Sequence, residues 1–112
     1  MKEIKAYVHR SRVADVIAAL KASPAWAAAV KASRHNLAVY MVKGSLLPLD
    51  DEERHYSLDL GDEVVNEYKL ELLCEDTEVE ELVQAICRAA HTGLAHSGLV
   101  TVTTLDQAIS IP

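Results

Sequence analysis

Two amphipathic helix patterns, each lying between strand patterns, constrain the fold of this chain most. The first apolar stripe has helical spacing and consists of Val13, Val16, Ile17 and Leu20. The second stripe has the same spacing and consists of Val79, Leu82, Val83, Ile86 and Ala90. Thr77 and Glu80 predict a capping box at the entry to the second helix. Because each helix is apolar along one stripe only, it must cover another element with that stripe.

Four stretches have strand character, and they surround the two helices in the order β-α-β-β-α-β. They are Glu3–Val8, Asn36–Val42, Tyr68–Cys74 and Leu99–Thr103. Ser23-Pro24 interrupts the first helix, and the alanine-rich run after it predicts one or two further helical turns. A short segment, Gln107–Ile111, follows the last strand. The order predicts an α+β, ferredoxin-like sandwich, in which both helices cover one face of a four-stranded antiparallel sheet.

The other face of this sheet is left with apolar side chains and no covering element. Alternation places Tyr7, Tyr40, Leu73 and alternate residues of LVTVT on it. An apolar sheet face exposed to water is unfavourable, so we expect a protein partner to cover it.

Length and charge exclude several classes of protein. The 112 residues suffice for a single domain, 1–112, with one core. The net charge is −6, and the basic residues form no large face, which argues against a nucleic-acid partner. Apolar runs end well short of a bilayer span of roughly 20 residues, and MKEIKAYV lacks the core of a signal peptide. We therefore expect a cytoplasmic chain that does not span a membrane, with Cys74 and Cys87 as reduced thiols.

The 23-residue stretch Ser45–Glu67 has no sustained period and is the strongest physical pointer to function. Loops of that length are usually functional or disordered, so we expect a long mobile loop. It contains a run of candidate docking residues for a basic partner surface: Asp50, Asp51, Glu52, Glu53, Arg54, His55 and Tyr56. The four adjacent carboxylates repel one another, so we expect the run to order only against a partner or a cation.

A second loop, HTGLAHSGL at His91–Leu99, joins the second helix to the last strand. It fits a plain connector, an anion cradle built from glycine-turn N–H groups, or half of a metal site formed by His91 and His96. The chain has no HExxH, GxSxG, Walker or dinucleotide motif, and its carboxylates have no obvious partner base. We therefore expect no catalytic residues and no enzyme activity.

Three separate motifs resemble the nitrogen-regulatory PII family. The stretch YKLELLCEDTEVEELVQAICRAAHTG is similar to the third strand, second helix and helix exit of that family. The opening MKEIKAYVHRSRVADVIAAL is similar to its first strand and helix, and Val42-Lys43-Gly44 is similar to the V-K-G that closes its second strand. The motifs keep their order and most of their spacing along nearly the whole chain.

This resemblance implies a homotrimer with nucleotide sites in the clefts between subunits. Ser45–Glu67 would be the mobile loop that docks on a protein partner, with membrane transporters among the partners of such proteins. The second loop would hold an adenine nucleotide or another small anion through Thr92, Gly93, His96, Ser97 and Gly98.

The phosphate loop departs from the family pattern, T-G-x-x-G-D-G-K, at three positions. His96 stands in place of a glycine, Ser97 in place of the aspartate and Leu99 in place of the lysine. Two arginines of the family's last strand fall on Ser110 and Pro112. Each lost cation removes charge-assisted hydrogen bonds of roughly 1.5–3 kcal/mol, so the usual ATP site is degraded.

The docking loop departs as well. The family's glutamine that links nucleotide, metal and 2-oxoglutarate falls on Pro48, and the tyrosine that is uridylylated in some members falls on Leu60. We therefore expect a divergent PII-like signalling protein that does not sense 2-oxoglutarate. The alternative is a metal-binding or cation-tolerance trimer of the same fold, which would use His91, His96 or loop carboxylates.

Overall fold

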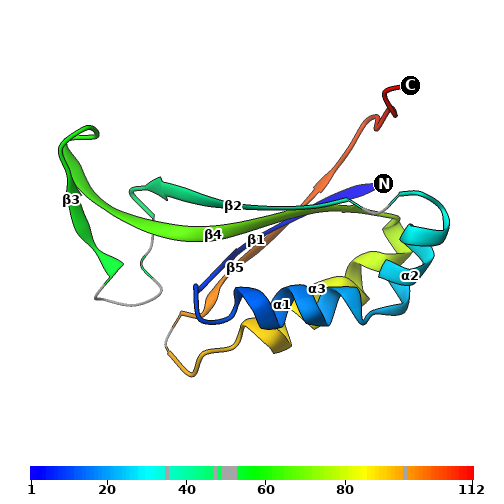
Figure 1. The fold of residues 1–112 in the computed structure, drawn as a ribbon, viewed down its shortest axis with the longest axis horizontal. Helices are drawn as coiled ribbons and strands as arrows, with labels where there is room; N and C mark the ends of the chain where they lie inside the picture. The colour runs from blue at the N-terminus through cyan, green and yellow to red at the C-terminus, as the bar shows by residue number, and fades with distance from the viewer. Residues whose placement is uncertain (35, 47, 49–52, 95) are drawn as a thin grey trace.

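A computed structural model describes residues 1–34, 36–46, 48, 53–94 and 96–112 (Figure 1). The elements are listed here in chain order: β1 (Lys2–Val8), α1 (Val13–Lys21), α2 (Pro24–Lys31), β2 (Leu37–Gly44), β3 (His55–Ser57), β4 (Asp62–Cys74), α3 (Val79–Ala90) and β5 (Gly98–Thr104). A short 3-10 turn, Asp76–Glu78, leads into α3.

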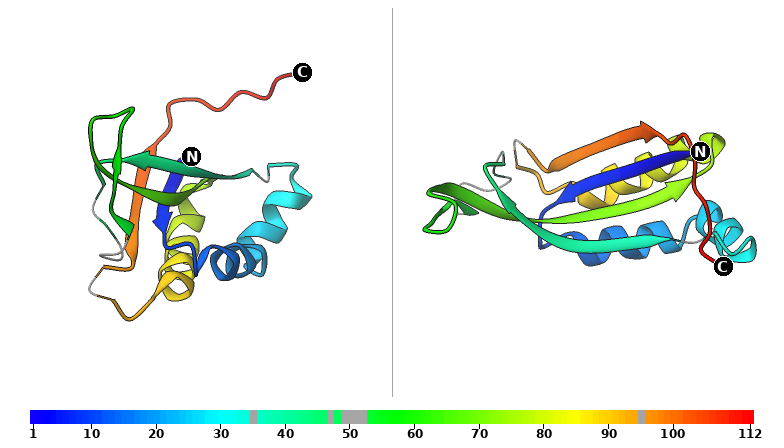
Figure 2. Two further views of the ribbon diagram at one scale, coloured as in Figure 1. Left: turned by 60° about the vertical axis from the view of Figure 1, so that its left-hand side comes forward. Right: turned by 90° about the horizontal axis from the view of Figure 1, so that it is seen from above.

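The sheet has the strand order β2-β4-β1-β5, and every neighbouring pair is antiparallel. Helices α1 and α3 pack together on one face of it, as the views in Figures 1 and 2 show. The largest fully buried side chains of the core between these layers are Ile4, Val8, Val16, Leu20, Leu70 and Ile86. The predicted ferredoxin-like α+β arrangement is therefore confirmed.

The predicted restart after Ser23-Pro24 is also confirmed, as helix α2. The Ser23 hydroxyl donates to the carbonyl of Leu20 (2.8 Å) and accepts from the N–H of Trp26 (3.2 Å), so it ends one helix and caps the next. The predicted capping box at Thr77 and Glu80 is wrong by two residues. Glu75 and Glu78 form it, because the chain makes a 3-10 turn before α3 begins.

The register confirms which side chains lie on the sheet face away from the helices. Ile4 pairs with Leu72 and faces the core, whereas Tyr7 and Tyr40 both lie opposite Lys69 on the open face. The ammonium of Lys69 lies 5.1 Å from the ring centre of Tyr7 and 5.6 Å from that of Tyr40. A hydrogen bond from the Tyr40 hydroxyl lowers the pKa of Glu71, so this face holds an organised cluster of rings and charges.

Part of the predicted loop over Ser45–Glu67 is a β-hairpin. β3 and the first half of β4 lie within that range, and β3 continues the direction of β2 along β4. Within this range, the described residues outside the strands are 45, 46, 48, 53 and 54 and the turn 58–61. The apolar residues of this part of β4, Val64 and Val65, are adjacent and both buried, so alternation could not reveal the strand.

The expected segment Gln107–Ile111 forms no helix or strand among the described residues, and the chain after Thr104 runs without regular structure. No single described helix is both long and apolar enough to span a bilayer. Only α1 and α2 together pass that test of length and composition, and they are bent by 65° where they meet.

Candidate functional site

The loop between α3 and β5 closes on itself through its own hydroxyl groups. The Thr92 N–H donates to the Ser97 hydroxyl (3.1 Å), and the two hydroxyl oxygens lie 3.0 Å apart. The Leu94 N–H donates to the Thr92 hydroxyl (3.2 Å). Two of the N–H groups that an anion cradle would offer are therefore already paired within the loop.

The two glycines of this loop are required for different reasons. Gly93 has φ +83°, and an added Cβ would meet no described atom within 4 Å, so only the turn itself favours glycine there. Gly98 has φ +151°, and an added Cβ would lie 2.2 Å from the Tyr7 carbonyl oxygen. Close packing of β5 on β1 thus accounts for Gly98 without any ligand.

A groove of about 360 Å³ lies beside this loop, between α3 and the facing ends of β1 and β5. Its walls are mainly apolar and include Tyr7, Val83 and Leu99, while His91 and Ser97 supply polar groups. Among the described residues that line it, none is a lysine or an arginine. The groove suits a small ligand with little negative charge better than a polyphosphate.

The predicted metal pair consists of two exposed histidines, His91 and His96. Within the described part of the chain, no group of three or more histidine, cysteine, aspartate or glutamate side chains is arranged to hold a metal ion. The two cysteines are free thiols, with Cys74 buried and Cys87 exposed on α3.

A buried contact that sequence reasoning missed joins the end of β1 to the base of the acidic loop. Nε2 of His9 lies 3.1 Å from Oε1 of Glu53, and the two side chains are 10% and 4% exposed. The Ser11 N–H donates to Nδ1 of His9 (3.1 Å), so the other ring nitrogen is the one that faces Glu53. These residues are distant in sequence and follow no shared pattern, so only the fold brings them together.

The structure divides the predicted docking run into three parts. Asp50, Asp51 and Glu52 lie outside the described residues. Glu53 is held against His9 and turned away from solvent. Arg54, His55 and Tyr56 are exposed where the chain enters β3. In the described part of the run, the exposed surface therefore begins at Arg54.

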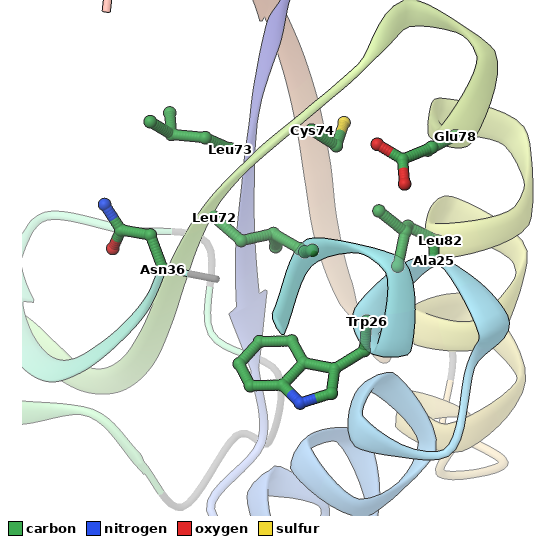
Figure 3. Close-up of a pocket in the computed structure, with 9 residues that line it drawn as sticks. Ala25, Trp26, Asn36, Leu72, Leu73, Cys74, Glu78 and Leu82 are labelled. Carbon is green, nitrogen blue, oxygen red and sulfur yellow. The ribbon is translucent and has the colours of Figure 1, made fainter. Parts of the chain in front are cut away.

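A smaller hollow, of about 10 Å³, lies among α2, β4 and α3 (Figure 3). Asn36, Cys74 and Glu78 contribute its polar groups, beside Trp26 and Leu82. Burial raises the pKa of the Cys74 thiol, and the carboxylate of Glu78 adds to that effect. The hollow has room for about one water molecule and no ligand, and Cys74 is a thiol of the core.

Two curated proteins align with this chain over 111 residues, which is 99% of its length. Nitrogen regulatory protein P-II from Pyropia yezoensis is 24% identical, and 91% of that protein is covered. Nitrogen regulatory protein P-II 2 from Methanothermobacter thermautotrophicus is 26% identical, and 89% of it is covered. The chain is PII-like along nearly its whole length. No family model matches it, which agrees with a divergent sequence.

The resemblance predicted from three motifs is thus confirmed by whole-chain similarity to PII proteins. The aligned region includes both loops. In this chain the loop between α3 and β5 pairs internally through Thr92 and Ser97, and Glu53 contacts His9 at the end of β1.

The two loop glycines provide a matched pair of variants. Gly98→Ala forces a methyl group into the Tyr7 carbonyl and strains φ, so we expect it to lower the free energy of unfolding by about 3 kcal/mol. Gly93→Ala strains φ alone and should cost about 1 kcal/mol. Urea unfolding of both variants measures the difference, and equal losses would contradict a packing role for Gly98.

The contact between His9 and Glu53 should contribute to stability. Glu53→Ala removes the carboxylate from a buried imidazole, so we expect the free energy of unfolding to fall by about 1–3 kcal/mol. Arg54→Ala is the matched control, because this neighbour is exposed and its change should stay within about 0.5 kcal/mol. Equal effects of the two variants in thermal unfolding would show that Glu53 is not held in place.

Proposed function

We propose that this chain is a PII-like signalling protein that regulates a protein partner by docking on it, and that it is not an enzyme. Similarity to PII proteins over 99% of the chain supports the class. The observation that carries docking is the hairpin of β2, β3 and β4, which extends past the helices and presents the described residues 54–63 at its far end (Figure 1). Such an extension adds little to the core, so binding is its best use.

We propose that the working form is a homotrimer of a single domain, 1–112. The open face supports this, because Tyr7, Tyr40 and Lys69 form an organised cluster that no described element of the same chain covers. Packing this face against other copies would bury it and would bring the groove beside β1 close to a neighbouring subunit. We place the protein in the cytoplasm, with a membrane transporter as one class of partner.

The groove is the proposed effector site, and it does not fit a nucleotide triphosphate. Leu99 and Ser97 stand where the phosphate-binding pattern has a lysine and an aspartate, and the Thr92 N–H is paired with Ser97. An effector with one phosphate or none, such as AMP, cyclic AMP or bicarbonate, requires fewer hydrogen-bond donors and cations from the loop. Its recognition would rest on apolar walls and on His91.

Thermal unfolding with candidate effectors tests this assignment. Millimolar ATP should leave the melting temperature unchanged, because the groove offers a triphosphate no described cationic partner. A micromolar Kd at that concentration would instead stabilise the fold by about 4 kcal/mol. A stabilisation of that size by ATP would contradict the assignment, and AMP and cyclic AMP serve as matched ligands with fewer phosphates.

A truncated hairpin tests the docking function. Gly44 pairs with Val65, so replacing Ser45–Val64 by Asn-Gly closes the hairpin with a two-residue turn. The variant loses the Glu53 and Val64 contacts but keeps the pairing of β1, β4 and β5, so we expect it to fold with reduced stability. It should no longer co-purify with the partner of the unmodified chain, as judged by mass spectrometry.

Circular dichroism provides the folding control for the truncated chain. Retained co-purification by a folded, truncated chain would contradict docking through this hairpin. Loss of self-association by the same chain would show that the hairpin is a structural element of the assembly.

A further inference from the structure

The far end of the hairpin carries three large apolar side chains that touch little of the protein. Leu58 is 89% exposed, Tyr56 61% and Leu60 55%. In Figure 1 this end lies opposite the helices and away from both termini. Because these side chains contribute little to the core, the fold does not explain why they are apolar.

The turn that carries Leu58 and Leu60 is held by two hydrogen bonds. The Gly61 N–H donates to the Ser57 carbonyl (2.8 Å), and the Leu60 N–H donates to the Ser57 hydroxyl (3.3 Å). Gly61 has φ +67°, which glycine adopts at low cost. The tip is therefore preformed, and a partner that binds it loses less free energy to ordering.

Carboxylates are close in sequence and in strand pairing to the apolar residues of the tip, since Asp59 lies between Leu58 and Leu60 and Glu63 pairs with Tyr56. Asp59, Asp62 and Glu63 are all exposed, and Asp62 also accepts a hydrogen bond from the Ser45 hydroxyl (2.9 Å), which ties the loop to the hairpin. Arg54 is the nearest cation along the described chain. The tip thus combines an apolar centre with a negative rim.

We propose that Leu58 and Leu60, flanked by Tyr56, insert into an apolar pocket of the partner protein whose rim carries lysine or arginine. This inference rests on the docking function proposed above and specifies its contact surface. Apolar anchors supply most of the affinity in such contacts, while opposite charges at the rim fix orientation and speed association.

The charge of the tip favours a protein pocket with a cationic rim over two other binding partners, a membrane surface and a second copy of the tip. An anionic membrane surface repels the three carboxylates, which opposes insertion of the tip into lipid. A symmetric contact between two tips would place the same carboxylates against one another. A pocket with a cationic rim satisfies both the apolar centre and the charges.

Cross-linking in cells identifies what the tip touches. Benzoylphenylalanine in place of Leu58 in the full-length chain should cross-link, on illumination, to a segment of another protein rich in apolar residues and in lysine or arginine. The matched control has the same group in place of Leu94, an exposed apolar residue in the loop after α3. Mass spectrometry of the cross-linked peptides reads out the segment.

The partner protein identified by cross-linking is then purified and titrated with variants of this chain. The titration measures how much the apolar tip and the carboxylates each contribute to binding. We expect Leu58→Asn with Leu60→Asn to weaken binding at least tenfold. Asp59→Asn with Glu63→Gln should weaken it mainly at low salt, because rim charges are screened at high salt. A control with Asp15→Asn and Glu80→Gln, two exposed carboxylates on the helices, should bind nearly as the unmodified chain does.

The outcomes separate this inference from the docking function. Unchanged binding by the Leu58 and Leu60 variant, together with loss in the Asn-Gly truncation, would overturn the apolar tip and leave docking intact. Cross-links from position 58 to lipid, to a second copy of this chain or to an acidic segment would also overturn it. A cross-linking yield at position 58 no higher than at position 94 would do the same. Binding that survives the truncation would overturn both proposals.

Discussion

The uncovered face of the sheet is the constraint on which the rest of this structure depends. Helices α1 and α3 cover the face that carries Ile4 and Leu70, and the chain has no further described element for the other face. The open face is nevertheless ordered by the ammonium of Lys69 between two tyrosine rings. An antiparallel sheet can leave one face to water, but this face carries Tyr7, Tyr40 and Leu73, and a second and third copy of the chain would cover these side chains.

The loop between α3 and β5 is held by close packing on β1 and by hydrogen bonds within the loop. Gly98 is required because β5 packs closely on the Tyr7 carbonyl, and Gly93 is required by the turn. Ser97 and Thr92 then pair with the N–H groups that a phosphate would otherwise use. Retained glycines are therefore weak evidence for phosphate binding in this chain, whereas the missing cations bear on it directly.

The sequence predicted the parts of the fold that follow from local periodicity, and less of what depends on contacts between distant residues. The stripes of α1 and α3 and the alternation of β1 were enough to predict the sheet and its two faces. The strand across Val64 and Val65 was missed, because both residues are buried and no alternation results. The contact of His9 with Glu53 was also missed, because it depends on where a long hairpin returns to the end of β1. The sequence predicted a connecting loop between the second helix and the last strand, and the structure has one there, but the internal pairing of that loop depends on side-chain geometry.

The mass of the protein in solution tests the central claim, that further copies of the chain cover the open face. Light scattering at micromolar concentration should give three times the 12.3 kDa of one chain. Tyr40→Glu with Lys69→Glu should reduce that mass, because the new carboxylates join Glu71 on the buried face. A mass of 12.3 kDa for the unmodified chain would contradict the claim, because the face would then be open to water in the working protein.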